Sequence, residues 1–282
     1  VEDNPVHKTK ILTVKENNRD IKVGYLMYNS FIAGTKAEPE KYNNELRSVS
    51  QKFKEAGVQA VILDLRYNEG GSMDCVQLLG TILTSADRLG EPMAYLEYND
   101  KNTDKDATIL FGTDREINLD LHSLIAITSG TTMGAPEMLI RSLFLEDVYP
   151  IATVGSSTKG QNVATEQFIN EEFLWSVNPV VCTVYNSQHD TYGAISPATD
   201  LKVSETTIDG STNYSEFLPF GTFDKDGKSE RLLKIAIGVL DGTYPPKDDE
   251  APEESTTQTR FKVEKSVNSP ASRRFSSKGL RL

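Results

Sequence analysis

Apolar and polar residues alternate near the start of the chain, and the alternation predicts a β-hairpin. In the stretch KILTVKENNRDIKVGYLMYNSF, apolar side chains recur at every second position on both sides of a polar turn at Glu16–Asp20. Such alternation is typical of strands with one buried face. We therefore expect strands near residues 10–15 and 21–28.

The next segment changes to helical spacing. Residues 38–57 place Leu46, Val49 and Phe53 on one face and end at Gly57, so they predict a helix. Residues 72–85 and 135–146 also have helical periodicity, and they lie between short unbroken apolar runs.

Unbroken apolar runs such as VQAVILDLR and SLIAITS are typical of strands that are buried on both faces. Their alternation with helices over residues 58–155 predicts βαβ units in an α/β fold with a mostly parallel sheet. The buried strands are expected near residues 60–65, 124–128 and 148–154.

The pattern weakens towards the end of the chain. Residues 160–220 carry aromatic and β-branched runs between turn residues, which predict added strands, and residues 229–242 predict a closing helix. The Pro-rich acidic stretch that follows is typical of a linker. We divide the chain into N-terminal strands (1–30), an α/β core (31–242) and a mobile linker with a basic tail (243–282).

Composition excludes some classes of function. The chain has 282 residues, of which 38% are hydrophobic and 25% charged, as expected for a globular protein with a sizeable core. Its net charge of −11 argues against nonspecific nucleic-acid binding. We see neither a membrane span nor a signal peptide in the given sequence. The oligomeric state stays open.

Cysteine and histidine give no sign of a metal or cofactor. Cys75 and Cys182 are far apart in the sequence, and two buried thiols are favoured over one disulfide. His7, His122 and His189 are scattered without the spacing of metal ligands. We therefore expect no metal and no cofactor.

Two strand-to-helix junctions could carry chemistry. In DLRYNEGGSM, Gly70 and Gly71 follow a buried strand, and their amides could form an oxyanion hole. A tight turn without a ligand is the alternative. Asp64 and Arg66, two residues apart on the same strand, predict a structural ion pair.

The second junction is TSGTTMGAPEML, residues 128–139, with Gly134 at the apex and Pro136 in the first helical turn. Lys159 follows the next buried strand. A lysine in a partly desolvated pocket loses its proton more easily and can act as a general base. A surface lysine is the alternative.

Together these segments resemble the catalytic domain of the C-terminal processing, or tail-specific, serine peptidases. VILDLRYNEGG, LIAITSGTTMGAPEMLI, DVYPIATVGSSTKGQ and YGAISPATDL occur in the order of that family, and the likeness covers residues 10–242. It implies a crotonase-like (Clp-protease/crotonase) core with a mostly parallel sheet and added β-strands. It also implies peptide or protein C-terminal segments as partners, an extracytoplasmic location in the periplasm or cell envelope, and a PDZ domain before the core.

The family's turn reads roughly T-A-S-A-S-E, with its first serine as nucleophile and a lysine 25 residues later as general base. Gly134 stands at the nucleophile position, Glu137 matches the glutamate, and Lys159 has the spacing of the base. The resemblance further implies an oxyanion hole formed by the amides of Gly70, Gly71 and Ala135.

The chain departs from the family pattern where the chemistry needs a hydroxyl. Without Oγ at position 134 no acyl-enzyme forms, so we expect no peptidase activity. Hydroxyls occur nearby at Ser129, Thr131, Thr132, Ser156 and Ser157, but none occupies the motif position. The chain is either a natural pseudoenzyme or one whose serine was removed deliberately. Pro136, in place of the motif's second serine, favours natural divergence.

Three functions stay open at this point. The first is a serine peptidase of this family that is inactive as written. The second is a non-catalytic peptide-binding or scaffold protein that uses the inherited cleft. The third is an acyl-CoA enzyme of the crotonase-like fold, against which Lys159 and the GAISPATDL segment argue. A peptidase assay separates the first two, and a CoA-binding test addresses the third.

Overall fold

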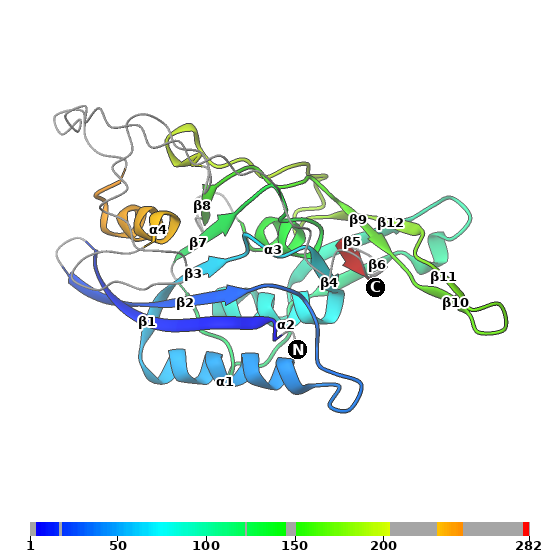
Figure 1. The fold of residues 1–282 in the computed structure, drawn as a ribbon, viewed down its shortest axis with the longest axis horizontal. Helices are drawn as coiled ribbons and strands as arrows, with labels where there is room; N and C mark the ends of the chain where they lie inside the picture. The colour runs from blue at the N-terminus through cyan, green and yellow to red at the C-terminus, as the bar shows by residue number, and fades with distance from the viewer. Residues whose placement is uncertain are drawn as a thin grey trace, which may run out of the picture.

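A five-stranded sheet in the order β1-β2-β3-β7-β8 lies at the centre of the molecule (Figure 1). The computed structural model describes residues 4–16, 19–121, 123–144, 151–203, 230–244 and 279–281. The strands are β1 (Val6–Glu16), β2 (Arg19–Tyr28), β3 (Val58–Asp64), β7 (Ser123–Thr128) and β8 (Ile151–Gly155).

The pairing in this sheet confirms the predicted hairpin and the mostly parallel arrangement. β1 and β2 are antiparallel, whereas β2–β3, β3–β7 and β7–β8 are parallel. Of the strand expected at 148–154, residues 148–150 lie outside the described residues.

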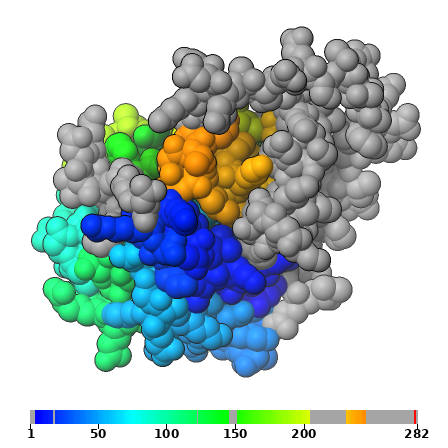
Figure 2. Space-filling model, turned by 90° about the vertical axis from the view of Figure 1, so that its left-hand side faces the viewer, coloured from blue at the N-terminus to red at the C-terminus, as the bar shows by residue number. Residues whose placement is uncertain are grey.

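Helices cover both faces of the sheet. Successive strand residues point to opposite sides, so apolar strands present two faces that must be buried. One face packs against α1 (Lys41–Glu55), α2 (Met73–Leu83) and α3 (Ala135–Leu143), and the other against α4 (Arg231–Asp241). α4 ends at Gly242, whose φ of 74° is the left-handed cap that glycine favours. Figure 2 shows α4 in orange beside the blue N-terminal strands.

A second sheet of six strands lies beside the first, in the order β4-β13-β9-β12-β5-β6. Its strands are β4 (Gly70–Ser72), β13 (Gly279–Arg281), β9 (Val163–Thr165), β12 (Val180–Tyr185), β5 (Pro92–Tyr98) and β6 (Ala107–Leu110). β13 is parallel to both β4 and β9, and the other pairs are antiparallel. The predicted tail thus contributes one strand, and residues 245–278 lie outside the described residues.

The remaining elements are short. β10 (Phe168–Asn170) and β11 (Trp175–Val177) form a separate two-stranded hairpin, which projects from the body of the molecule (Figure 1). The 3-10 helices are η1 (Ala86–Arg88), η2 (Thr103–Lys105) and η3 (Thr199–Leu201). The added strands expected within residues 160–220 are therefore found between residues 163 and 185, and residues 204–220 are outside the described part.

Both cysteines are buried and unbridged, which confirms the sequence prediction. Burial raises the pKa of the Cys75 thiol to about 12 and that of Cys182 to about 11, so both are protonated at neutral pH. No helix among the described residues is long and apolar enough to cross a membrane. Within the same ranges, no group of three His, Cys, Asp or Glu side chains could hold a metal ion.

Candidate functional site

The candidate site lies where three parallel strands end. The segments after β3, β7 and β8 meet at one edge of the sheet, as the carboxyl ends of parallel strands do. Hydrogen bonds between backbone groups join these segments. Met133 N–H donates to the Asn68 carbonyl at 3.2 Å, and Lys159 N–H donates to the Thr132 carbonyl at 3.0 Å. The structure therefore brings both sequence-predicted junctions together.

Gly134 occupies the apex of a sharp strand-to-helix turn. It is the residue immediately before α3, it is buried, and its φ of 70° and ψ of −106° lie in a region that L side chains rarely adopt. A strained turn of this kind carries the nucleophile in α/β-hydrolases. The backbone thus has the form of a nucleophile turn, although the residue has no side chain.

Glu137 fixes this turn relative to the segment after β8. Its side chain is fully buried, and each carboxylate oxygen accepts two hydrogen bonds. One oxygen accepts from the amides of Gly134 at 2.9 Å and Gln161 at 2.8 Å. The other accepts from the Thr158 hydroxyl and the Gly160 amide, both at 2.5 Å. Four donors satisfy a buried carboxylate whose desolvation would otherwise be costly.

Lys159 lies between two residues that Glu137 binds, but its own side chain is exposed. Thr158 and Gly160 face inward in this extended segment, so the residue between them faces outward. Its ammonium group makes no ion pair with any residue the structure describes. The Lys159 side chain therefore does not lie in the partly desolvated pocket that we expected.

The two glycines predicted for the oxyanion hole differ in what their amides can do. Gly70 and Gly71 lie in β4 with φ values of 107° and 141°. The Gly70 amide donates to Asn68 Oδ1 at 2.9 Å, so it is already engaged. A Cβ at position 71 would lie 2.2 Å from the Phe31 carbonyl oxygen, so only glycine fits there.

The Gly71 amide faces away from Phe31. The Gly70 carbonyl accepts from Phe31 N–H, and Ser72 N–H donates to the Phe31 carbonyl. Because backbone groups alternate in direction along a strand, the Gly71 N–H and carbonyl point to the opposite edge, where β13 lies. Ala135 begins α3, and a first-turn amide has no partner within its helix.

The hydroxyls near the turn are directed at backbone carbonyls. Ser129 Oγ and Thr131 Oγ1 both donate to the Arg66 carbonyl, and Thr132 Oγ1 donates to the Leu65 carbonyl at 2.8 Å. Ser157 Oγ is paired with Ser196 Oγ. The Ser129, Thr131 and Thr132 side chains thus hold the residues after β3 against the turn, and none of these hydroxyls occupies the apex.

A buried ionic cluster stabilises the same strand end. Arg66 Nη2 lies 2.7 Å from a carboxylate oxygen of Asp64 and 2.7 Å from one of Glu230, and Tyr25 OH donates to Asp64 at 2.7 Å. The predicted Asp64–Arg66 ion pair is confirmed. Burial, reinforced by the Asp64 charge, raises the pKa of Tyr25 above its usual range.

Sequence reasoning missed four residues of this region. Asn68, two residues before Gly70, shows a recognisable Asx-turn signal. Glu230 caps α4 by accepting from Leu233 N–H, but nothing in the sequence links it to Arg66. Thr158 and Tyr192 have no local signal. Burial, with a smaller contribution from the Glu137 charge, raises the pKa of Tyr192.

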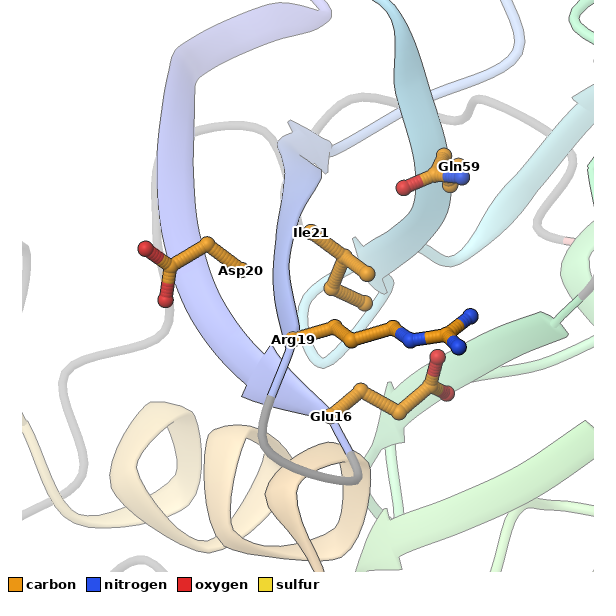
Figure 3. Close-up of a pocket in the computed structure, with 5 residues that line it drawn as sticks. All are labelled: Glu16, Arg19, Asp20, Ile21 and Gln59. Carbon is orange, nitrogen blue, oxygen red and sulfur yellow. The ribbon is translucent and has the colours of Figure 1, made fainter.

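A cavity of about 590 Å³ lies elsewhere and is not part of this site (Figure 3). It is lined by Glu16, Arg19, Asp20, Ile21 and Gln59, which lie at the β1–β2 turn and the start of β3. That is the opposite edge of the sheet from Gly134. Figure 3 shows the Arg19 side chain directed towards Glu16, while Asp20 points away from both.

The family model described as "Peptidase family S41" matches residues 22–177, more than half of the chain. The chain belongs to peptidase family S41. A crystal structure assigned as an S41 protease from Bacteroides fragilis NCTC 9343 is 35% identical, with a TM-score of 0.73. The match covers 86% of this chain and 59% of that one.

A more distant solved structure is that of a photosystem II D1 C-terminal processing protease, which is 17% identical with a TM-score of 0.52. It covers 72% of this S41 chain and 49% of its own length, and it shows a likeness of fold alone. No curated protein matches the chain. The S41 chain described here thus spans about three fifths of one solved relative and half of the other.

Proposed function

We propose that this S41 chain is the peptidase portion of a C-terminal processing, or tail-specific, protein, built on a crotonase-like core. It binds peptide or protein C-terminal segments and, as written, does not hydrolyse them. The observation that carries the proposal is the turn at Gly134, which Glu137 ties to the segment containing Lys159. The spacing of Gly134 and Lys159 supports the same assignment.

Each residue of the proposed site has a defined task. In a Ser–Lys peptidase the serine hydroxyl attacks the scissile carbonyl, the lysine accepts its proton, and backbone amides stabilise the oxyanion. Here Lys159 supplies the amine, and Gly71 and Ala135 supply amides at the edge of the turn. Glu137 acts as a positioning residue, because it binds the backbone on both sides of Lys159.

The missing hydroxyl blocks the first covalent step. Without an oxygen on residue 134, no bond to the substrate carbonyl can form there. The neighbouring hydroxyls of Ser129, Thr131 and Thr132 donate to carbonyls of the β3 end. Loss of a nucleophile typically lowers kcat by about a millionfold. Resemblance to extracytoplasmic bacterial members supports a location in the periplasm or cell envelope.

A second function is favoured by one observation. The Lys159 amine is exposed, whereas a catalytic lysine needs a desolvated setting to lose its proton. A protein that only binds peptides, by adding them to a strand edge, needs no such setting. The two candidates therefore differ in whether a hydroxyl at position 134 is sufficient for cleavage.

The decisive variant is Gly134→Ser, assayed with a library of fluorogenic peptides. We expect no cleavage by the unmodified chain, measurable cleavage by the variant, and none by Gly134→Ser combined with Lys159→Ala. The serine must adopt a left-handed backbone, at a cost of about 1–3 kcal/mol in stability.

Gly130→Ser is the matched control. Gly130 lies in the same loop and is exposed, and a Cβ added there would meet no atom within 4 Å, so a serine there adds a hydroxyl without strain. Cleavage by the unmodified chain or by this control would contradict the assignment of position 134. A folded but silent Gly134→Ser variant would favour the binding protein over the peptidase.

A further inference from the structure

We propose that the position between β4 and β9 is a binding site for an extended peptide strand, and that residues 279–281 of the chain occupy it as an internal ligand. We call this position the β4–β9 slot. Occupation would place the chain's own backbone against Gly71 and exclude other peptides. That β13 keeps substrate peptides away from a catalytic edge rests on the proposed function, whereas the existence of the binding site does not.

The sheet order defines the slot. β13 lies between β4 and β9 and is parallel to both, and among the described strands it alone joins β4 to the rest of the second sheet. Neighbouring strands are about 4.8 Å apart, so β4 and β9 stand roughly 9.6 Å from each other. That distance admits one extended chain, with backbone donors and acceptors offered from both sides.

The slot also selects a side chain. Leu280 is only 1% exposed and belongs to the main core cluster. Its register partners are Gly71 on β4 and Ala164 on β9, and these small residues leave room for a branched apolar side chain. Thr165 Oγ1 adds a hydrogen bond to the Leu280 carbonyl at 3.2 Å. The preferred ligand is therefore an extended peptide with leucine at its centre.

The slot overlaps the proposed catalytic edge. Gly70 and Ser72 direct backbone groups at Phe31, so the Gly71 amide is directed at β13. That amide is the one we assign to oxyanion stabilisation. A bound β13 and a substrate peptide would therefore compete for the same backbone group. The internal strand would act as a pseudosubstrate that keeps the site occupied.

Competition by a tethered segment should lower the apparent affinity for an added peptide by a measurable factor. A segment on the same chain acts at an effective concentration in the millimolar range, well above typical peptide concentrations. The apparent affinity for an added peptide falls in proportion to the fraction of molecules whose site is open. If β13 fills the slot in nine molecules of ten, releasing it should tighten binding of an added peptide by about tenfold.

The test uses the full chain and a labelled peptide. The probe is a dye-labelled peptide with the sequence Ser-Lys-Gly-Leu-Arg-Leu of residues 277–282, blocked at both ends, and its anisotropy is followed during titration. We expect Leu280→Asp to bind the probe at least about tenfold more tightly than the unmodified chain does. A probe with Asp in place of its central leucine should not bind.

Leu174→Asp is the matched control, because the same substitution is made in a side chain that is 90% exposed on the projecting hairpin. It should bind the probe as weakly as the unmodified chain. Equal binding by Leu280→Asp and Leu174→Asp, with both folded by far-UV circular dichroism, would overturn the proposal.

Hydrogen exchange gives a second test if Leu280→Asp does not fold. In the unmodified chain, a ligand-like β13 should detach locally, so the amides of residues 279–281 should exchange at least about tenfold faster than those of β12. Excess unlabelled probe should bind the opened slot and protect the amides of β4 and β9. Exchange of β13 only through global unfolding would show that it is a permanent strand and overturn the proposal.

The results separate this inference from the proposed function. Probe binding to Leu280→Asp together with a silent Gly134→Ser variant would support the slot and contradict the peptidase. Cleavage by Gly134→Ser together with unchanged probe binding would do the reverse. If both hold, adding Leu280→Asp to Gly134→Ser should raise kcat/KM for peptides by about tenfold, the factor expected from opening the site.

Discussion

The Asp64–Arg66–Glu230 cluster and the Glu137 cluster both bury carboxylates close to the Gly134 turn, but they compensate the charge differently. In the first cluster, one guanidinium serves two carboxylates at 2.7 Å each. In the second, Glu137 accepts four bonds from neutral amides and a hydroxyl. It has no ion-pair partner among the residues that the structure describes.

The difference separates the support of the fold from that of the site. Arg66 connects the end of β3 to the start of α4, so it holds this helix to the central sheet. Glu137 connects only the Gly134 turn and residues 158–161, which carry Lys159. Arg66 thus supports the packing of α4, whereas Glu137 holds the Gly134 turn in place relative to residues 158–161.

Removal of the guanidinium should have the largest effect. Arg66→Met leaves Asp64 and Glu230 buried without their cation, and breaking such a pair costs about 3–5 kcal/mol of unfolding free energy. Urea unfolding followed by far-UV circular dichroism measures it. Arg47→Met, which breaks an exposed pair with Glu40, should cost less than about 1 kcal/mol. Equal losses in the two variants would show that the buried cluster adds nothing to the fold.

Neutralising the Glu137 carboxylate should lower the free energy of unfolding less than Arg66→Met does. It should loosen the backbone of the candidate site more. Glu137→Gln places an amide NH₂ against two donors, whichever way it turns, and unsatisfied buried donors cost about 1–3 kcal/mol. Faster amide exchange at Gly160 and Gln161, with unchanged exchange in β3, would confirm that Glu137 stabilises the candidate site and not the central sheet. A loss as large as that of Arg66→Met would contradict the distinction.

The tyrosines next to the two clusters should differ from each other, and Tyr192→Phe should have the smallest effect of all. Tyr25→Phe removes a hydrogen bond to an ionised group and should cost about 1.5–3 kcal/mol. Tyr192→Phe should be neutral or slightly stabilising, because its buried hydroxyl has no hydrogen-bond partner among the described residues. Thermal unfolding of both variants measures the contrast, and a larger loss for Tyr192→Phe would reverse it.

The same tyrosines predict a decline in stability at high pH. Burial raises the pKa of Tyr25 and of Tyr192 above their unfolded values, so the folded state retains protons that the unfolded state releases. The two protonated tyrosines contribute fully to the free energy of unfolding below about pH 10, the ordinary tyrosine pKa. This contribution is lost as the pH rises towards their pKa in the folded state. Either Phe variant should therefore show a shallower alkaline decline than the unmodified chain.

Local sequence patterns were sufficient for the central sheet and insufficient for the second one. β3 and β7 are continuous apolar runs, so their burial could be predicted from the residues themselves. β4 has the sequence Gly-Gly-Ser and is a strand only because Phe31 and β13 bond its two edges. No local property of residues 70–72 encodes either partner.

The candidate site divides in the same way. The turn at Gly134 and the place of Lys159 after a buried strand could be predicted, because an apolar run and the residues that end it are local features of the sequence. Engagement of the Gly70 amide by Asn68, and outward exposure of Lys159, depend on side-chain directions that only the folded chain specifies. Glu230 reaches Arg66 across 164 positions, a distance at which one sequence carries no signal.

The projecting β10–β11 hairpin determines what intrinsic emission can report about this protein. Trp175 is the sole tryptophan of the sequence, and it lies on this hairpin with 48% of its surface exposed. The hairpin belongs to neither large sheet. Indole emission therefore reports on the local environment of this hairpin and not on the packing of either large sheet. A ligand that docks on the hairpin should therefore shift the emission wavelength of Trp175 even if it contacts no residue of the core.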